Sequence, residues 1–151
     1  GSHVGSNPEA GEKWAKGELT VDLLPQGSMA EMIRAGGMGI PGILTATGIG
    51  TLVEESPWVD RKMTIEGKDY LLMKPLHADF AVISGYLGET RGNIWYKGTT
   101  RNFAPLMAMA ADTVIVEAEK IVAPGEIPPE DVATPGILVD YIVLREGTDN
   151  G

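Results

Sequence analysis

The sequence predicts an α/β protein with an open, largely parallel sheet, flanking helices and one β-hairpin. Helical and strand patterns alternate along the chain, as they do in α/β folds. Two nearly continuous apolar runs, Asp79–Leu87 and Asp112–Glu117, carry few charges, which is typical of parallel strands covered on both faces. The 151 residues are expected to form a single domain, 1–151, in which 145–151 is a fraying tail.

Composition and charge exclude several classes of function. Hydrophobic residues make up 43% of the chain and charged residues 22%, as in folded globular proteins. The net charge is −9 and the twelve lysines and arginines never cluster, so we expect no binding to nucleic acid, which needs a basic patch. The chain has no cysteine, which rules out disulfides, thiolate nucleophiles and cysteine-based metal sites. The sequence therefore predicts no metal site.

Targeting signals are missing from the sequence. No apolar run approaches the roughly 20 residues of a membrane-spanning helix, and the N-terminus lacks the pattern of a signal peptide. We therefore expect a cytoplasmic protein without a membrane partner. The only two imidazoles belong to His3 and His77, and His77 is interpreted as a structural residue.

The first elements are predicted from capping residues and alternation. Asn7 followed by Pro8 indicates the start of a helix, which Gly17 would end. Leu19–Leu24 alternates apolar with polar residues and is predicted to be a strand. Pro25 would end that strand, because proline cannot donate to a sheet ladder.

A short helix is predicted next, followed by a long glycine-rich loop. Ser28 and Glu31 have the spacing of a capping box, in which each side chain bonds the backbone at the other's position. Gly36–Gly50 contains too much glycine for any periodicity, so it is predicted to be a loop.

The second half of the chain alternates strands with short helices. Gly67 is expected to form the turn of the hairpin, and Asn102 to cap the helix Phe103–Ala111. A further short helix is expected near Pro129–Val132. The remaining strands are expected at Leu52–Glu54, Met63–Ile65, Tyr70–Met73, Ile94–Tyr96 and Ile137–Leu144.

The run from Gly37 to Gly42 matches G-x-G-x-x-G letter for letter, but it does not predict a dinucleotide site. That fingerprint must follow a strand and open a helix, so that the pyrophosphate meets the helix N-terminus. Here the glycines follow a helix and lead into Pro41 and more glycine.

Two polar residues have both a structural and a functional interpretation. Gln26 stands between proline and glycine just before a helix, where it is either a turn residue or an amide donor into a cleft at the end of a strand. Arg101 either lies in water beside a helix start or faces an anionic substrate or partner.

Several blocks of the sequence resemble the α (A) subunit of the family I, 3-oxoacid type, coenzyme A transferases. The blocks follow one another in register from about Ser2 to Leu144, so that they cover nearly the whole chain. The longest contains the P-Q-G turn with Gln26. The blocks are Glu18–Gly37, Leu44–Thr51, Thr100–Phe103, Met107–Asp112 and Thr134–Ile137.

The resemblance implies an α subunit that works with a β subunit to move coenzyme A from a short-chain acyl-CoA to a free carboxylic acid. The acids expected are acetate, acetoacetate or butyrate. In that family a β-subunit glutamate attacks the thioester to give an acyl-glutamyl anhydride, which the released thiolate converts to a glutamyl-CoA thioester. Coenzyme A and acyl-CoA are then substrates, and no permanently bound cofactor is expected.

The resemblance also assigns residues to the site. Gln26 corresponds to a glutamine that supports the β-subunit glutamate, and a neutral amide donor suits that role because it can stabilise an oxyanion without reacting. The candidate cofactor-binding positions lie in the loop expected to shape the cleft beside Gln26, and they are Gly37, Gly39, Gly48 and Gly50.

The chain departs from the family pattern in three respects, which are its missing first segment, the absence of the catalytic glutamate and two local substitutions. It lacks the family's first segment, and the catalytic glutamate belongs to another subunit, so we expect an N-terminally truncated α subunit that is inactive alone. Ala46 replaces a proline. Glu89 and Thr90 stand where aspartate and arginine are usual, which removes a cation.

Other interpretations stay open at this point. The chain could belong to a 3-oxoadipate or succinate CoA-transferase, or it could be a non-catalytic acidic α/β interaction module. Besides a hetero-oligomer with a β subunit, we expect self-association through an apolar patch exposed where the first segment is missing.

Overall fold

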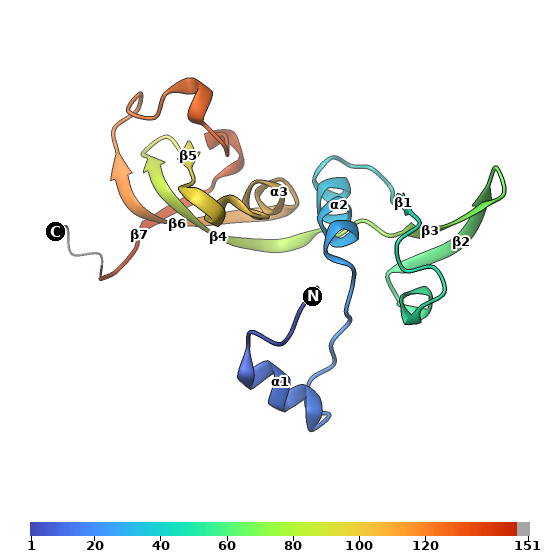
Figure 1. The fold of residues 1–151 in the computed structure, drawn as a ribbon. Helices are drawn as coiled ribbons and strands as arrows, with labels where there is room; N and C mark the ends of the chain where they lie inside the picture. The colour runs from blue at the N-terminus through green and yellow to red at the C-terminus, as the bar shows by residue number, and fades with distance from the viewer. Residues whose placement is uncertain (148–151) are drawn as a thin grey trace. The chain divides into compact units, whose positions relative to one another are not determined.

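The computed structural model describes residues 1–147, which pack as two compact units (Figure 1). The first unit comprises residues 1–35 and 39–76. The second comprises residues 36–38 and the chain from His77 onward. The expected single domain stays a prediction, and the last four residues of the expected tail lie outside the described part of the chain.

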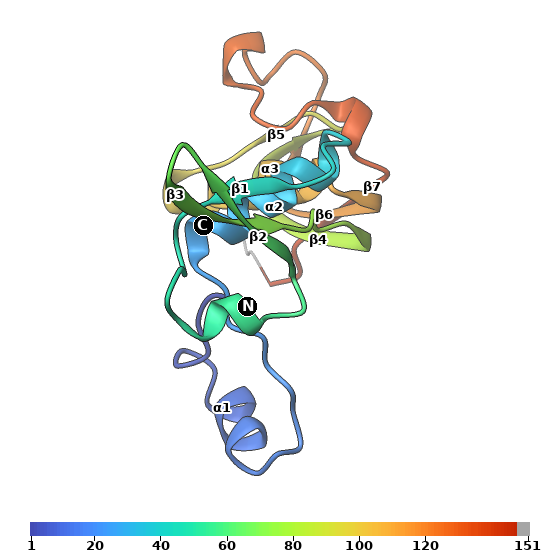
Figure 2. The same cartoon turned by 90° about the vertical axis from the view of Figure 1, so that its right-hand side faces the viewer.

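Two helices, α1 (Pro8–Ala15) and α2 (Gln26–Gly37), precede the first sheet. The prediction for α1 is confirmed: Asn7 is its N-cap, and the Asn7 Oδ1 accepts a hydrogen bond of 3.0 Å from the Ala10 amide. Figure 2 shows the extended stretch of chain that joins the two helices.

The predicted capping box of α2 is wrong, because the helix starts earlier. The Met29 amide donates to the Pro25 carbonyl at 2.9 Å, so the helical hydrogen bonds begin three residues before Ser28. Ser28 is therefore a buried residue inside the first turn. Glu31 does not bond to the backbone at Ser28 as a capping box requires, since its carboxylate accepts a hydrogen bond from the Arg34 Nε at 2.9 Å.

Two predicted strands of the first unit are also wrong. Leu19–Leu24 is irregular, with Leu19 and Leu23 exposed, because no strand within residues 1–147 pairs with it. Leu52–Glu54 belongs to a 3₁₀ helix, η1 (Leu52–Glu55). Thr51 caps this helix, and its Oγ1 accepts from the Val53 amide at 3.2 Å.

The first sheet is antiparallel, with the strand order β1-β3-β2. Its strands are β1 (Ile43–Thr45), β2 (Val59–Ile65) and β3 (Lys68–Met73). The predicted hairpin is confirmed as β2–β3, and its two turn residues, Glu66 and Gly67, both have positive φ, of 49° and 77°. Strand β1 was not predicted, because it lies within the glycine-rich loop.

Helix α2 covers the first sheet and closes its core. Met32 of α2, Leu71 and Met73 of β3, and Leu24 are buried and pack together. Close packing also explains why position 42 is a glycine, since a Cβ there would lie 2.7 Å from the Met73 carbonyl oxygen. The core therefore fixes both α2 and the loop that leads into β1.

The second sheet confirms the predicted parallel sheet. Its strand order is β5-β4-β6-β7, in which β4, β6 and β7 are parallel and β5 is antiparallel to β4. The strands are β4 (Ala78–Glu89), β5 (Ile94–Trp95), β6 (Ala111–Val122) and β7 (Tyr141–Leu144).

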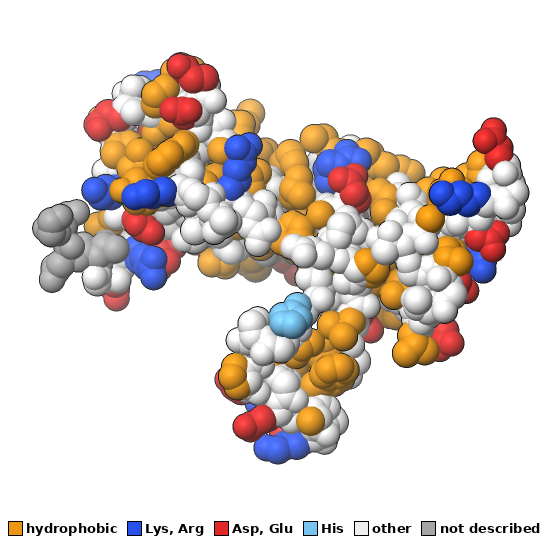
Figure 3. All heavy atoms as spheres, viewed as in Figure 1, with side chains coloured by type: hydrophobic (Ala, Val, Ile, Leu, Met, Phe, Trp, Pro, Cys, Tyr) orange, Lys and Arg blue, Asp and Glu red, His pale blue; other side chains and the backbone are white. Residues whose placement is uncertain are grey.

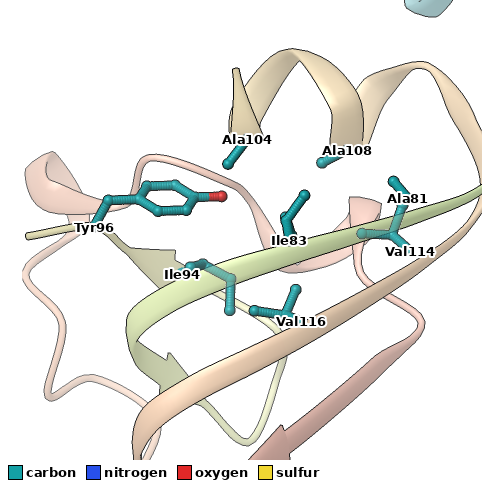
Figure 4. Packing of buried hydrophobic residues seen from close by; sticks show 8 residues of the cluster. All are labelled: Ala81, Ile83, Ile94, Tyr96, Ala104, Ala108, Val114 and Val116. Carbon is teal, nitrogen blue, oxygen red and sulfur yellow. The ribbon is translucent and has the colours of Figure 1, made fainter. Parts of the chain in front are cut away.

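Helix α3 (Ala104–Met109) covers one face of this sheet. Figure 4 shows Ala104 and Ala108 of α3 above Ile83 of β4 and Val114 of β6. The small alanine side chains let the helix approach the sheet closely. These side chains form the buried core of the second unit.

The other face of the second sheet is open within the described residues, so the prediction that β4 is covered on both faces is wrong. Burial alternates along β4 because helices cover only one side. Phe80 and Val82 are 65% and 68% exposed. We call this surface the open sheet face, and its apolar members are Phe80, Val82, Ile115, Tyr141 and Val143.

Of three further predictions for the second unit, two differ from the structure in detail and one is confirmed. Asn102 does not cap α3 but ends the 3₁₀ helix η2 (Gly98–Arg101), with a φ of 25°. The short helix near Pro129 is confirmed as η3 (Pro129–Asp131). The last strand begins only at Tyr141, because residues 136–138 form the 3₁₀ helix η4.

A buried carboxylate ties the end of β4 to the loop after β6. Glu89 is 2% exposed, and it accepts hydrogen bonds from the Gly125 amide at 2.8 Å, the Ile127 amide at 3.3 Å and the Asn93 Nδ2 at 2.7 Å. The Gly125 amide is the main cause that lowers the pKa of Glu89, and the Asn93 amide and nearby Arg91 act in the same direction. These backbone and side-chain donors therefore favour the charged form of Glu89.

We predict that Glu89→Gln reduces the pH dependence of stability in acid. Because folding lowers the pKa of Glu89 below its ordinary 4.5, its stabilising effect is complete above about that pH and is lost as the pH falls through the folded pKa. Thermal unfolding followed by circular dichroism from about pH 3 to pH 7 measures this. The Tm of the wild-type chain should fall more steeply with acidification than that of the variant. The exposed Glu130→Gln is the control, and equal slopes for all three chains would contradict the prediction.

Candidate functional site

Gln26 lies at the start of α2 and is free to act as a donor. It is the first residue of the helix, and its side chain is exposed. The Gln26 amide has no hydrogen-bond partner among residues 1–147. The buried Met32, six residues further along α2, packs the helix against the core of the first unit, while the side chain of Gln26 is exposed.

A groove of about 470 Å³ lies next to Gln26 within the first unit. Pro25, Gly27 and Ser28 line it from the start of α2. The loop before β1 and β1 itself form the opposite wall, with Gly42 and Thr45 among the lining residues. The structure therefore brings the two neighbours of Gln26 and part of the glycine-rich segment together in one groove, but Gln26 itself is not among the residues that line it.

The groove also contains charged and hydroxyl groups. Arg34 and Glu31 line it and form an ion pair of 2.8 Å on the surface of α2. Thr45 and Thr47 contribute hydroxyl groups from the other wall, and the Thr45 Oγ1 accepts from the Thr47 amide at 3.1 Å. Such a mixture of donors beside an apolar strand suits a small carboxylic acid.

None of the four candidate glycines lines the groove. Gly48 has a φ of 97°, and a Cβ there would lie 2.8 Å from the Val53 side chain. Gly39 and Gly50 also have positive φ. Gly37 belongs to the second unit, where a Cβ would lie 2.7 Å from the Met109 backbone. Contact with substrate at these positions stays a prediction.

A surface network fixes the end of the glycine-rich loop. The Glu54 carboxylate accepts from the Gly50 amide at 2.6 Å, which is the main cause that lowers the pKa of Glu54. Lys62 lies 3.4 Å from Glu54 and 3.2 Å from Asp69, and its bond to Asp69 is the main cause that raises the pKa of Lys62. These groups join the loop to the hairpin, so the network is structural.

The other sequence candidates belong to the second unit and are not among the residues that line the groove. Arg101 is exposed at the end of η2, and both interpretations of it stay predictions. His77 is half exposed, and its Nε2 lies 3.9 Å from the Asp112 Oδ1. Within residues 1–147 no three histidine or acidic side chains gather in a way that could hold a metal ion. None of the helices in that range has the length and apolar character needed to cross a membrane.

The sequence pattern of the coenzyme A transferase family matches residues 1–145. The chain belongs to this family.

Curated members of the family are similar over nearly all of this chain. The alpha subunit of acetoacetyl-CoA:acetate/butyrate CoA transferase from Clostridium acetobutylicum is 52% identical over 142 residues, which cover 94% of this chain and 64% of the relative. The alpha subunit of acetate CoA-transferase from Escherichia coli is 45% identical, over 96% of this chain and 64% of the relative. This chain therefore spans a little under two thirds of the length of these relatives.

Solved structures show the same fold. An acyl-CoA transferase from E. coli O157:H7 superposes with a TM-score of 0.85 at 23% identity, over 95% of this chain and 31% of that one. Glutaconate coenzyme A-transferase from Acidaminococcus fermentans superposes with a TM-score of 0.76 at 22% identity, over 88% of this chain and 48% of that one. These likenesses confirm the α/β fold class predicted from the sequence.

Proposed function

We propose that this chain is part of the α subunit of an enzyme that moves coenzyme A from a short-chain acyl-CoA to a free carboxylic acid. The observation that carries the proposal is the placement of Gln26. It is exposed in the turn between Pro25 and Gly27, and these two neighbours line a groove together with Leu44, Thr45 and Thr47 of a second block that resembles the family. The enzyme would work in the cytoplasm as a hetero-oligomer with a β subunit.

The chemistry divides between the two subunits. A β-subunit glutamate attacks the acyl-CoA carbonyl carbon, the carbon–sulfur bond breaks, and coenzyme A leaves as a thiolate. The thiolate then attacks the glutamyl carbonyl of the anhydride and releases the first acid as its carboxylate. The second acid repeats these two steps in reverse and leaves as its acyl-CoA.

In this scheme Gln26 donates its amide N–H to the oxygen that gains negative charge in each attack. A neutral hydrogen-bond donor held in position in this way raises the reaction rate by a factor on the order of 10²–10³. Gln26 carries no charge and does not itself react, so it supports the glutamate through all the steps. The chain alone has no such glutamate and is expected to be inactive.

The groove is the proposed site of the acid. Its volume of about 470 Å³ exceeds the need of a short acid, which leaves room for the end of the acyl-CoA. Arg34 provides a cation at its rim. The glycines at 37, 39, 48 and 50 are proposed to shape the loop around this site.

Acetate, acetoacetate and butyrate are the proposed acids, because the relative named for acetate and butyrate has the higher identity. That identity is 52%, against 43% for the matching subunit of 3-oxoadipate CoA-transferase from Acinetobacter baylyi. A 3-oxoadipate or succinate enzyme is the runner-up.

We predict CoA exchange when a complete α chain carrying this sequence is purified together with its β subunit. Chromatography of the acyl-CoA products measures it, with acetoacetyl-CoA and succinyl-CoA as donors. The acceptors are acetate, butyrate, 3-oxoadipate and succinate. Exchange with acetate or butyrate supports the proposal, whereas exchange only with the dicarboxylic acids supports the runner-up. A folded complex that exchanges with none of these acids would show that the chain is an interaction module.

A further inference from the structure

Leu44 is an exposed apolar residue in the middle of β1, and it lines the groove beside the P-Q-G turn. Successive side chains of a strand point to opposite faces of the sheet. Ile43 pairs with the buried Met73 and packs against the core, so Leu44 points to the other face, where it is 46% exposed. Packing in the core of the first unit therefore does not explain a large apolar side chain at position 44.

A second exposed apolar side chain lines the same groove. Ile40 is 36% exposed, and it belongs to the loop that leads into β1. Single apolar side chains are common on protein surfaces, but Ile40 and Leu44 together give one groove an apolar wall. Figure 3 shows hydrophobic side chains beside a basic and an acidic side chain over α2 and β1. An apolar wall of this kind suits the hydrocarbon tail of a short carboxylic acid.

The charged groups of the groove are paired with each other. Among the described residues that line it, only Glu31 and Arg34 carry a charge. The Glu31 Oε2 lies 2.8 Å from the Arg34 Nη2 and 2.9 Å from the Arg34 Nε. Because Glu31 balances the charge of Arg34, the groove offers no spare cation to a second carboxylate. A dicarboxylic acid would place that carboxylate against the apolar wall or near Glu31, and both placements are unfavourable.

We propose that Leu44 determines the specificity of the transferase, because it contacts the hydrocarbon tail of the acid and thereby favours monocarboxylic acids such as butyrate. The inference rests on the proposed function and adds the residue that selects the acid. In the proposed reaction the carboxyl group reacts beside Gln26, whose two neighbours line the groove, so the tail extends into the groove toward β1. Burial of each methylene group against such a wall strengthens binding roughly fourfold.

The test uses the complete α chain with its β subunit, with acetoacetyl-CoA as donor and with acetate and butyrate together at equal concentration. Chromatography of the two acyl-CoA products at early times gives the ratio of the kcat/KM values of the two acids. Leu44→Ala should lower the ratio of butyryl-CoA to acetyl-CoA on the order of tenfold, because the longer tail loses its contact. The control is Ile65→Ala, since Ile65 is 39% exposed in the same sheet but does not line the groove. Its product ratio should equal that of the wild type.

A second variant tests the same contact by adding a cation. Leu44→Arg supplies the charge that the groove lacks for a second carboxylate. In a mixture of butyrate and succinate, the ratio of succinyl-CoA to butyryl-CoA should therefore rise about tenfold or more. A role of Leu44 in folding alone would lower the rates with all acids together and would move neither ratio.

Several results would overturn the inference. An unchanged product ratio in either Leu44 variant would do so, as would a change in Ile65→Ala equal to that in Leu44→Ala. An equal loss with every acid, together with a raised KM for acetoacetyl-CoA, would place the coenzyme rather than the acid against Leu44. These outcomes leave the proposed reaction standing, because acyl-CoA products still form. A wild-type complex that exchanges with no acid would overturn the proposed function, and this inference with it.

Discussion

Replacing Gln26 with alanine is expected to lower the turnover of the α/β complex on the order of 10²-fold. The physical reason is the loss of one placed N–H donor where negative charge develops during attack on the acyl carbon. Stability should change little, because Gln26 is exposed and its side chain makes no hydrogen bond to another residue between 1 and 147. Steady-state kinetics with acetoacetyl-CoA and acetate, together with thermal unfolding of the same complex, measure both effects.

The pattern of the kinetic change separates the possible roles of Gln26. An interaction made only in the transition state lowers kcat and kcat/KM equally, whereas one made equally with the bound substrate raises KM alone. We expect equal losses. Glu12→Ala, which alters an exposed helical residue of the same unit, should leave turnover unchanged. Unchanged turnover in Gln26→Ala would reduce Gln26 to a turn residue.

The elements predicted correctly are those with all their determinants close in sequence. Helix α1 depends on Asn7 and Pro8 at its start, and the hairpin depends on the Gly67 turn between two apolar runs. The long strands β4 and β6 have enough apolar length to be found in isolation.

The errors occur where a distant or a competing group decides the structure. Leu19–Leu24 has the right alternation, but a strand needs a neighbour, and the described chain offers only Gly1. Ser28 has the spacing of a cap, but the Pro25 carbonyl starts the helix first. Strand β1 is only three residues long and exists because Ile43 pairs with Met73.

The site also combines a feature that nearby residues determine with one that distant residues determine. Gln26 was identifiable as a polar residue at a sharp turn, and the resemblance gave it a role. The groove beside it was not predictable in detail, because Gly42 and Thr45 reach it through the packing of β1 on β3. No local pattern in the glycine-rich loop indicates that arrangement.

The open sheet face is expected to make the 151-residue chain self-associate. Parallel strands are normally covered on both faces, yet Phe80, Val82 and Tyr141 are each more than 60% exposed on this one. The sheet register aligns Val82, Ile115 and Tyr141 in one row, so the apolar surface is continuous. Contiguous apolar surface of this kind promotes association. The net charge of −9 opposes it, and added salt should therefore strengthen association by screening.

The double variant Phe80→Ser and Val82→Ser should weaken self-association on the order of 10²-fold, because two large side chains lose the benefit of burial in the interface. Sedimentation velocity over a range of concentrations measures the dissociation constant. Ile137→Ser is the matched control, because Ile137 is 94% exposed and lies outside the open sheet face. Its association should equal that of the wild type.

A wild-type chain that stays a monodisperse monomer at high concentration and high salt would contradict the prediction. Equal weakening by Ile137→Ser would place the interface elsewhere. The Tm of the double variant should not fall, because both side chains are exposed in the single chain, and so a loss of association can be assigned to the face itself.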